Sequence, residues 1–138
     1  MIAQALLQDW LYDQLDADVT LATVVGERIS NGYPDKMEAR PFVVFRAQES
    51  TAVTGVGRTH VWDTTFEVVA NATGNAVKSL QTAADRFDVL LDNIKVSTAA
   101  LAMRWEKQAE IADVQILYGQ ERYSRLGGMY RVRASPIY

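Results

Sequence analysis

Residues 59–70 read THVWDTTFEVVA, and residues 75–94 read NAVKSLQTAADRFDVLLDNI. In the first stretch Trp62 and Phe66 lie an even number of residues apart, so they share one face of a strand. In the second stretch apolar residues recur at the helical period. They are Ala76, Leu80, Ala83, Ala84, Phe87, Leu90, Leu91 and Ile94. The two stretches therefore predict a strand whose apolar face packs against a helix over residues 75–93.

The same alternation gives the predicted strand a polar face. Asp63 and Glu67 point away from the apolar face, and we expect that side to be solvated. Residues 42–48 are also rich in β-branched and aromatic side chains, which predicts a partner strand. The residues between the strands, STAVTGVG at 50–57, are small and include two glycines. This composition favours a hairpin with a long, flexible tip.

Elements on either side complete one α+β domain over residues 1–138. We expect an amphipathic helix at 2–16, a short helical turn at 18–25 ended by Gly26, a brief strand at 27–30 and a loop through 41. Strand character returns at 101–107, 114–118 and 128–135. Because no linker separates these segments, the prediction is a single, mainly antiparallel sheet packed by one long helix and an N-terminal amphipathic helix.

Composition limits the classes of function. The 138 residues are 49% hydrophobic, carry a net charge of −3 and contain no cysteine. An acidic balance gives no general attraction to nucleic acid or anionic membrane, and the lack of cysteine fits a reducing cytosol. The N-terminus has no basic region followed by an uninterrupted apolar run, so we expect no signal peptide and no membrane span.

Candidate catalytic groups are few. The single histidine, His60, lies in a predicted strand on the face opposite Asp63, so the two cannot form a local acid–base pair. Asp9, Asp13 and Asp16 share one helix face, a pattern more typical of a solvated face than of a metal site. We therefore expect no catalytic residue, no cofactor and no metal.

Charge divides along the chain. Residues 1–100 hold 8 basic and 13 acidic side chains, whereas residues 101–138 hold 6 basic and 4 acidic ones. Arg131 and Arg133 alternate with apolar residues, so they share the outward face of the last strand. They could pair with Asp63 and Glu67 within one sheet. Alternatively, they could bind the acidic helix face of a neighbouring subunit in a head-to-tail ring, through Asp9, Asp13 and Asp16.

Several segments resemble the tail-terminator (tail-completion) proteins of long-tailed bacteriophages. These are LLQDWL at 6–11, the Val-x-x-Arg-Ile step at 25–29, RPFVVF at 40–45, TFEVVA at 65–70 and YRVRA at 130–134. The resemblance spans almost the whole chain, although segment 101–127 departs from the shortest family members and has no assigned role. The source could equally be a phage, a prophage or a phage-derived particle such as a gene transfer agent.

The resemblance implies a non-enzymatic virion protein, assembled in the host cytoplasm and located at the head–tail junction. It implies a homo-oligomer, a six-membered ring on the last disc of the tail tube, that stops tube polymerisation and binds a head–tail connector protein. The genome would pass through the ring without sequence-specific binding. We expect the hairpin tip to dock on the tail-tube protein through Thr51, Val53, Thr54, Val56 and Arg58. The alternative is a small-ligand-binding or enzymatic α+β domain, as a monomer or a dimer, whose pocket would require polar residues converging on the buried face.

Overall fold

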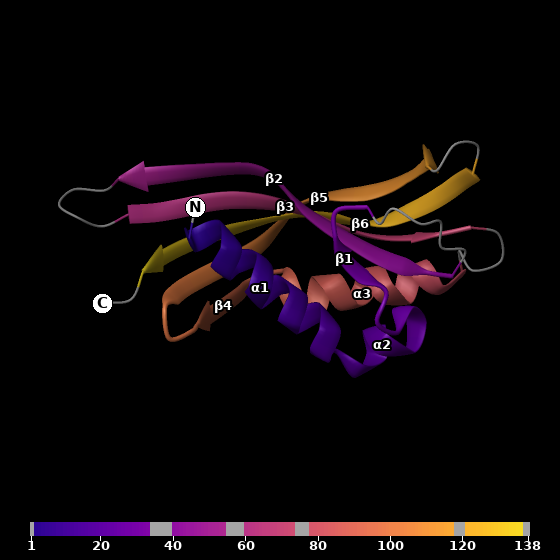
Figure 1. Cartoon of the computed structure of the whole chain (residues 1–138), viewed down its shortest axis with the longest axis horizontal. Coiled ribbons are helices and arrows are strands. Elements are labelled where there is room, and N and C mark those ends of the chain that lie inside the picture. Colours follow the sequence, from indigo (N-terminus) through magenta and orange to yellow (C-terminus); the bar gives the residue numbers. More distant parts are fainter. Residues whose placement is uncertain (1, 34–39, 55–59, 74–77, 118–120, 137–138) are drawn as a thin grey trace.

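The helices of the described residues lie together on one side of a long, curled sheet (Figure 1). The strand order is β1-β2-β3-β6-β5-β4, with β1 parallel to β2 and the other neighbours antiparallel. This computed structural model describes residues 2–33, 40–54, 60–73, 78–117 and 121–136, with side chains described from 5 onward except at 49–54, 60, 116–117, 121 and 136. The predicted α+β fold with a mainly antiparallel sheet is confirmed.

The strands are much longer than the helices that cover them. The helices are α1 (Ile2–Ala17), α2 (Val19–Val25) and α3 (Leu80–Leu91). The strands are β1 (Ile29–Asn31), β2 (Phe42–Thr54), β3 (His60–Ala72), β4 (Ile94–Ser97), β5 (Leu101–Leu117) and β6 (Glu121–Pro136). A 12-residue helix is about 18 Å long, whereas a 17-residue strand spans roughly 55 Å. Both long hairpins therefore extend beyond the helical layer.

The helix-facing side of the sheet carries the main core. Phe66 is fully buried, and its ring centroid lies 5.7 Å from that of Trp105 on β5. Trp10 of α1 stacks on the same Trp105 ring at 5.2 Å. From α3 come Leu80, Ala83, Phe87 and Leu91, and from α1 come Leu7, Leu11 and Leu15. The predicted packing of Phe66, with the half-buried Trp62, on the helical side is confirmed.

Polar contacts fix the helices on that core. Asp88 of α3 accepts a hydrogen bond from the Tyr130 hydroxyl at 2.7 Å and lies 2.9 Å from the Lys107 Nζ. Asp18 caps the first turn of α2 by accepting from the Leu21 amide at 3.1 Å. Its two oxygens also accept from Arg86 of α3 at 2.8 and 2.9 Å, which joins α2 to α3.

Two β-bulges bend the sheet along a single row. Ala47, Phe66, Tyr130 and Lys107 are cross-strand neighbours on β2, β3, β6 and β5. The register shifts next to this row on both outer strands, between Ala47 and Glu49 and between Lys107 and Ala109. Each bulge adds one unpaired residue and increases the local twist, so the sheet curls at this row.

The outward face is not uniformly solvated, which corrects the expectation for Glu67. Phe42, Val44, Val69 and Tyr123 form a second buried cluster there. Glu67 is 5% exposed beside it. The curl of the sheet brings side chains from β2, β3 and β6 together on this face, which a single-strand alternation cannot reveal.

Several predicted boundaries were too short. Residues 50–54, expected in a flexible tip, continue β2 and pair with residues 60–64 of β3. Residues 55–59 lie outside the described part of the chain. The separate strands predicted at 101–107 and 114–118 are one strand, β5, paired along its length with β6. Strand β4 was not predicted. By contrast, α3 at Leu80–Leu91 is shorter than the helix predicted over 75–93, of which residues 75–77 lie outside the described part of the chain.

Gly127 on β6 permits the close approach of β3, and its replacement gives a stability prediction. An alanine Cβ there would lie against the Val68 carbonyl oxygen and 2.8 Å from the Val69 Cα, both on rigid backbone. We expect Gly127→Ala to lower the free energy of unfolding by about 3 kcal/mol or more. Val114→Ala, at a 60% exposed site, is the control and should change it by less than about 0.5 kcal/mol. Urea denaturation measures both, and an unchanged midpoint for Gly127→Ala would contradict the described register.

Candidate assembly surfaces

The predicted interface arginines have a partner within their own sheet. Arg131 Nε donates to Asp63 Oδ1 at 2.7 Å, and Arg131 Nη2 contacts the other carboxylate oxygen. Arg133 Nε lies 3.6 Å from the same carboxylate, but its side chain remains 57% exposed. The in-sheet pairing therefore holds for Asp63. Because Arg131 is already paired, Arg133 is more accessible than Arg131 to a neighbouring molecule.

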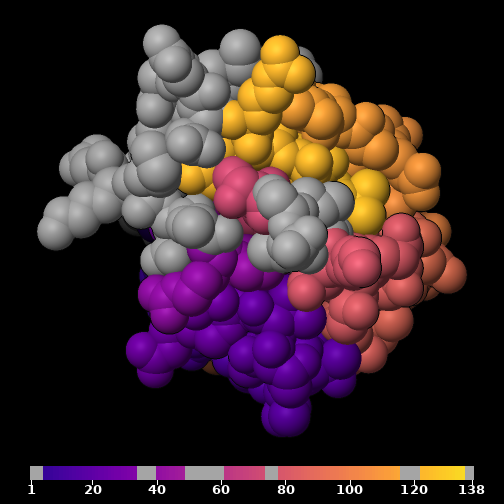
Figure 2. All heavy atoms as spheres, turned by 90° about the vertical axis from the view of Figure 1, so that its right-hand side faces the viewer, coloured from indigo at the N-terminus to yellow at the C-terminus, as the bar shows by residue number. Residues whose placement is uncertain are grey.

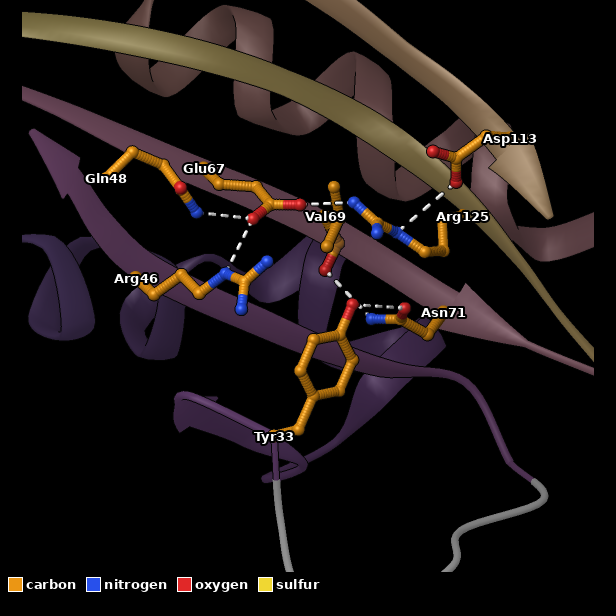
Figure 3. A network of polar contacts seen from close by, with 8 residues as sticks. All are labelled: Tyr33, Arg46, Gln48, Glu67, Val69, Asn71, Asp113 and Arg125. Carbon is orange, nitrogen blue, oxygen red and sulfur yellow. Dashed lines mark hydrogen bonds and ion pairs between the residues drawn. The ribbon is translucent and has the colours of Figure 1, made fainter. Parts of the chain in front are cut away.

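Glu67 has different partners from those considered in the sequence. It accepts hydrogen bonds from Arg46 Nε and Gln48 Nε2, each at 2.7 Å, and from the buried Arg125 (Figure 3). Arg125 Nε also lies 3.3 Å from a carboxylate oxygen of Asp113. The Glu67 carboxylate and the Arg125 guanidinium thus neutralise each other where little solvent reaches them. This is an internal network that stabilises the curled sheet.

The same network includes an aromatic ring and an amide (Figure 3). The Tyr33 hydroxyl donates to Asn71 Oδ1 at 3.4 Å, and the Arg46 guanidinium lies 5.6 Å from the Tyr33 ring centroid. Asn71 Nδ2 in turn donates to the Val69 carbonyl at 3.4 Å. Polar side chains therefore converge on the outward face, where they contact one another, and among the described residues Thr64 is buried on the helix-facing side.

The predicted acidic face of α1 is exposed. Asp9, Asp13 and Asp16 all lie on the solvent side of the helix, opposite its buried leucines. Leu6 and Tyr12 flank this stripe, and each is 38% exposed. The stripe thus combines negative charge with accessible apolar surface.

Three cations form a row that the sequence analysis did not identify. Lys95 on β4 is paired in register with Arg104 on β5, which is paired with Arg133 on β6. All three side chains are exposed, and they point away from the core because their strand neighbours Val96, Met103 and Val132 pack into it. A hollow of about 370 Å³ lies among them. Only the strand register, which places residues 95, 104 and 133 side by side, could have revealed this row.

The distal part of the β5–β6 hairpin projects beyond the helices. Residues 108–115 of β5 are exposed on both strand faces except for the half-buried Ile111, and Val114 is 60% exposed. Figure 2, which looks at this end of the molecule, shows β5 and β6 in orange and yellow above the indigo and salmon helical layer. Of the unassigned segment 101–127, residues 101–105 thus belong to the core strands, and residues 108–115 form the exposed part of the β5–β6 arm.

Three of the five predicted docking residues lie at the opposite end of the molecule. Thr51, Val53 and Thr54 belong to the end of β2, and His60 begins β3, although their side chains are outside the described set. Val56 and Arg58 lie outside the described residues altogether. The docking role of this tip stays a prediction.

Further features bear on the other classes of function. Within the described ranges no group of three or more histidine, cysteine, aspartate or glutamate side chains could hold a metal ion. Over the same ranges no helix is long and apolar enough to cross a membrane. A second hollow, of about 450 Å³, is bounded by Leu80, Ala112, Val114 and Leu126 near the buried Arg125.

Comparison with known proteins finds a similar fold among solved structures. A single α+β domain with this sheet is similar to a chain in a solved structure described as the virion of a native gene transfer agent particle. The TM-score is 0.65 with 18% sequence identity, and the match covers 91% of each chain. No protein-family model and no curated protein matches the sequence. The likeness shows a shared fold with a component of a phage-like particle.

The Glu67–Arg125 network predicts a stability effect. Glu67→Gln leaves Arg125 buried with only the half-exposed Asp113 beside it, so we expect the free energy of unfolding to fall by about 3 kcal/mol. The matched control is Glu110→Gln, because the Glu110 side chain is 80% exposed and should contribute little. Chemical denaturation compares the two variants, and equal stability losses would show that Glu67 is not held as described.

The Asp63–Arg131 pair predicts a pH dependence. Hydrogen bonds from Arg131 hold the pKa of Asp63 below its usual range. Its contribution to stability is therefore fully present above the unfolded-state pKa and is lost as pH falls through the lower folded-state pKa. We expect Asp63→Asn to destabilise the protein at neutral pH, with the difference from wild type shrinking below about pH 4. Urea denaturation across this range tests it, with Glu110→Gln as control, and a pH-independent difference would contradict the pairing.

Proposed function

We propose that this chain is a structural virion protein that caps the tail tube as a ring, ends tail polymerisation and forms the head–tail joining surface. The observation that carries the proposal is the fold match to a gene transfer agent virion chain over 91% of both chains. Because the match is nearly complete in both directions, the likeness covers the whole architecture rather than one motif. The tail-terminator resemblance of the sequence segments supports the finer role.

The shape of the subunit supports a capping role. A subunit in a ring must contact two neighbours laterally and, at a junction, two different partners axially. Here two long hairpins project at opposite ends, β2–β3 at one end and β5–β6 at the other (Figure 1). The ends of both hairpins extend past the part of the sheet that packs against the helices, so they are available to bind partners. We assign the β2–β3 end to the last disc of the tail tube and the β5–β6 arm to the head–tail connector protein.

Charge is consistent with a passage for the genome rather than with a binding site for it. The chain is acidic overall, with a net charge of −3, so a ring of such subunits has no general attraction for DNA. The protein would assemble in the cytoplasm of the host and remain in the virion at the head–tail junction.

Capping can be tested by reconstitution. Purified protein is added to the tail-tube protein of the same particle while tubes polymerise, and tube lengths are measured by electron microscopy. We expect one end of each tube to carry a ring and tube growth to stop there. Tubes that grow to the same lengths with and without the protein would contradict the proposal.

Two substitutions test which hairpin end binds the tail tube and which binds the head–tail connector protein. We expect Val53→Asp, at the β2–β3 end, to abolish capping of tubes because it introduces a charge into the docking tip. Val114→Asp, on the β5–β6 arm, serves as the matched control: it should leave tube capping intact and instead block joining to heads. Loss of capping in the second variant but not the first would reverse the assignment.

A further inference from the structure

The cation row is unusual because like charges are direct cross-strand neighbours. Lys95 and Arg104 face each other in register, as do Arg104 and Arg133. Like charges placed opposite each other on a sheet destabilise it. In the described structure Lys95 and Arg104 form no ion pair with any described carboxylate, and Arg133 only shares Asp63 with Arg131. This part of the fold therefore carries repulsion that the subunit relieves only at Arg133, through Asp63.

The row is part of a locally positive surface on an acidic protein. Lys95, Arg104, Arg131 and Arg133 lie on the outward face of neighbouring strands. The carboxylates there are Asp63 and Glu106, the second paired in register with Arg131. Four cations thus face two anions, and the hollow of about 370 Å³ leaves room for groups of a partner beside Arg104 and Arg133. An anionic partner would relieve the repulsion.

We infer that this row docks the acidic stripe of α1 from a second copy of the chain. The inference rests on the proposed function, since it names the lateral interface of the proposed ring. Asp9 and Asp16, with Asp13 between them, are seven helical steps apart, which is about 10.5 Å. Lys95 and Arg133 are separated by two strand spacings, which is about 9.6 Å. Three anions and three cations are therefore matched in number and spacing and are opposite in charge.

The contact must be between subunits. The α1 helix lies on the helix-covered face of the sheet, and the cation row points away from that face. One subunit therefore cannot bring its own two surfaces together. Joining different surfaces of successive copies gives a head-to-tail interface, which is the kind that closes into rings. Leu6 and Tyr12, both partly exposed beside the acidic stripe, supply apolar area that charge alone does not.

Two complementary variants test the interface in trans. Variant A is Lys95→Glu with Arg104→Glu, and variant B is Asp9→Lys with Asp13→Lys. Alone, each places like charges at every lateral contact, so we expect association to weaken at least about 100-fold and light scattering to show monomers. Mixed, the acidic stripe of A meets the intact row of B, and the basic stripe of B meets the acidic row of A. Equimolar mixing should therefore restore rings of alternating subunits.

Controls separate this interface from general charge effects. Lys78→Glu with Arg122→Glu changes two exposed cations elsewhere by the same charge, and its rings should be unchanged. Circular dichroism melts check that all variants fold. Wild-type rings should also weaken as salt rises, since exposed charges are screened over roughly 8–10 Å near physiological ionic strength. Rings of A that match wild type, or a mixture of A and B that stays monomeric, would overturn the inference.

Three outcomes separate a failed interface from a failed function and from a phosphate contact. If wild type forms rings and caps tubes while variant A does so equally well, only the interface is wrong. If wild type stays monomeric both alone and on tubes, the proposed function itself fails. If A keeps its rings but loses binding to a 30-base-pair DNA duplex that wild type binds, the row contacts phosphates and the inference is overturned.

Discussion

The close packing of β6 against β3 at Gly127 is the constraint on which the rest of the structure depends. Glycine at this position lets the two central strands approach, and the flanking bulges on β2 and β5 bend the sheet along one row. The bend places Tyr130 and Lys107 where Asp88 of α3 binds both. With α3 fixed there, the helices cover one face of the sheet, and the charged side chains of the outward face remain uncovered by helices.

Those outward charges divide into two kinds at the bend. On one side Glu67 and Arg125 are buried, neutralise each other and hold neighbouring strands together. On the other side Lys95 and Arg104 are exposed and lie beside further cations. A buried, paired charge is explained by the stability of one subunit, whereas an exposed row of like charges is not. This difference separates the structural network from the surface that we assign to assembly.

Much of the fold could be predicted from local sequence patterns. The alternation that places Phe66 on the core side and the helical period around Phe87 both depend on apolar burial, which is strong and local. The long β5 strand could not be predicted in the same way. Its middle, EKQAEIA at 106–112, is polar and has the composition of a helix, and it is held in a strand by pairing with β6.

The candidate sites show the same limit. The exposed acidic stripe followed from the helical period of α1, because Asp9, Asp13 and Asp16 are close in sequence. The partners of Glu67 and the row containing Lys95 and Arg104 depend on register between distant strands, which one sequence does not specify.

A three-dimensional reconstruction of the intact particle tests the central claim most directly. The account predicts a ring of this chain at the head-proximal end of the tail tube, with α1 of each subunit on the cation row of the next. A reconstruction that places the chain elsewhere in the particle, or outside any ring, would contradict it.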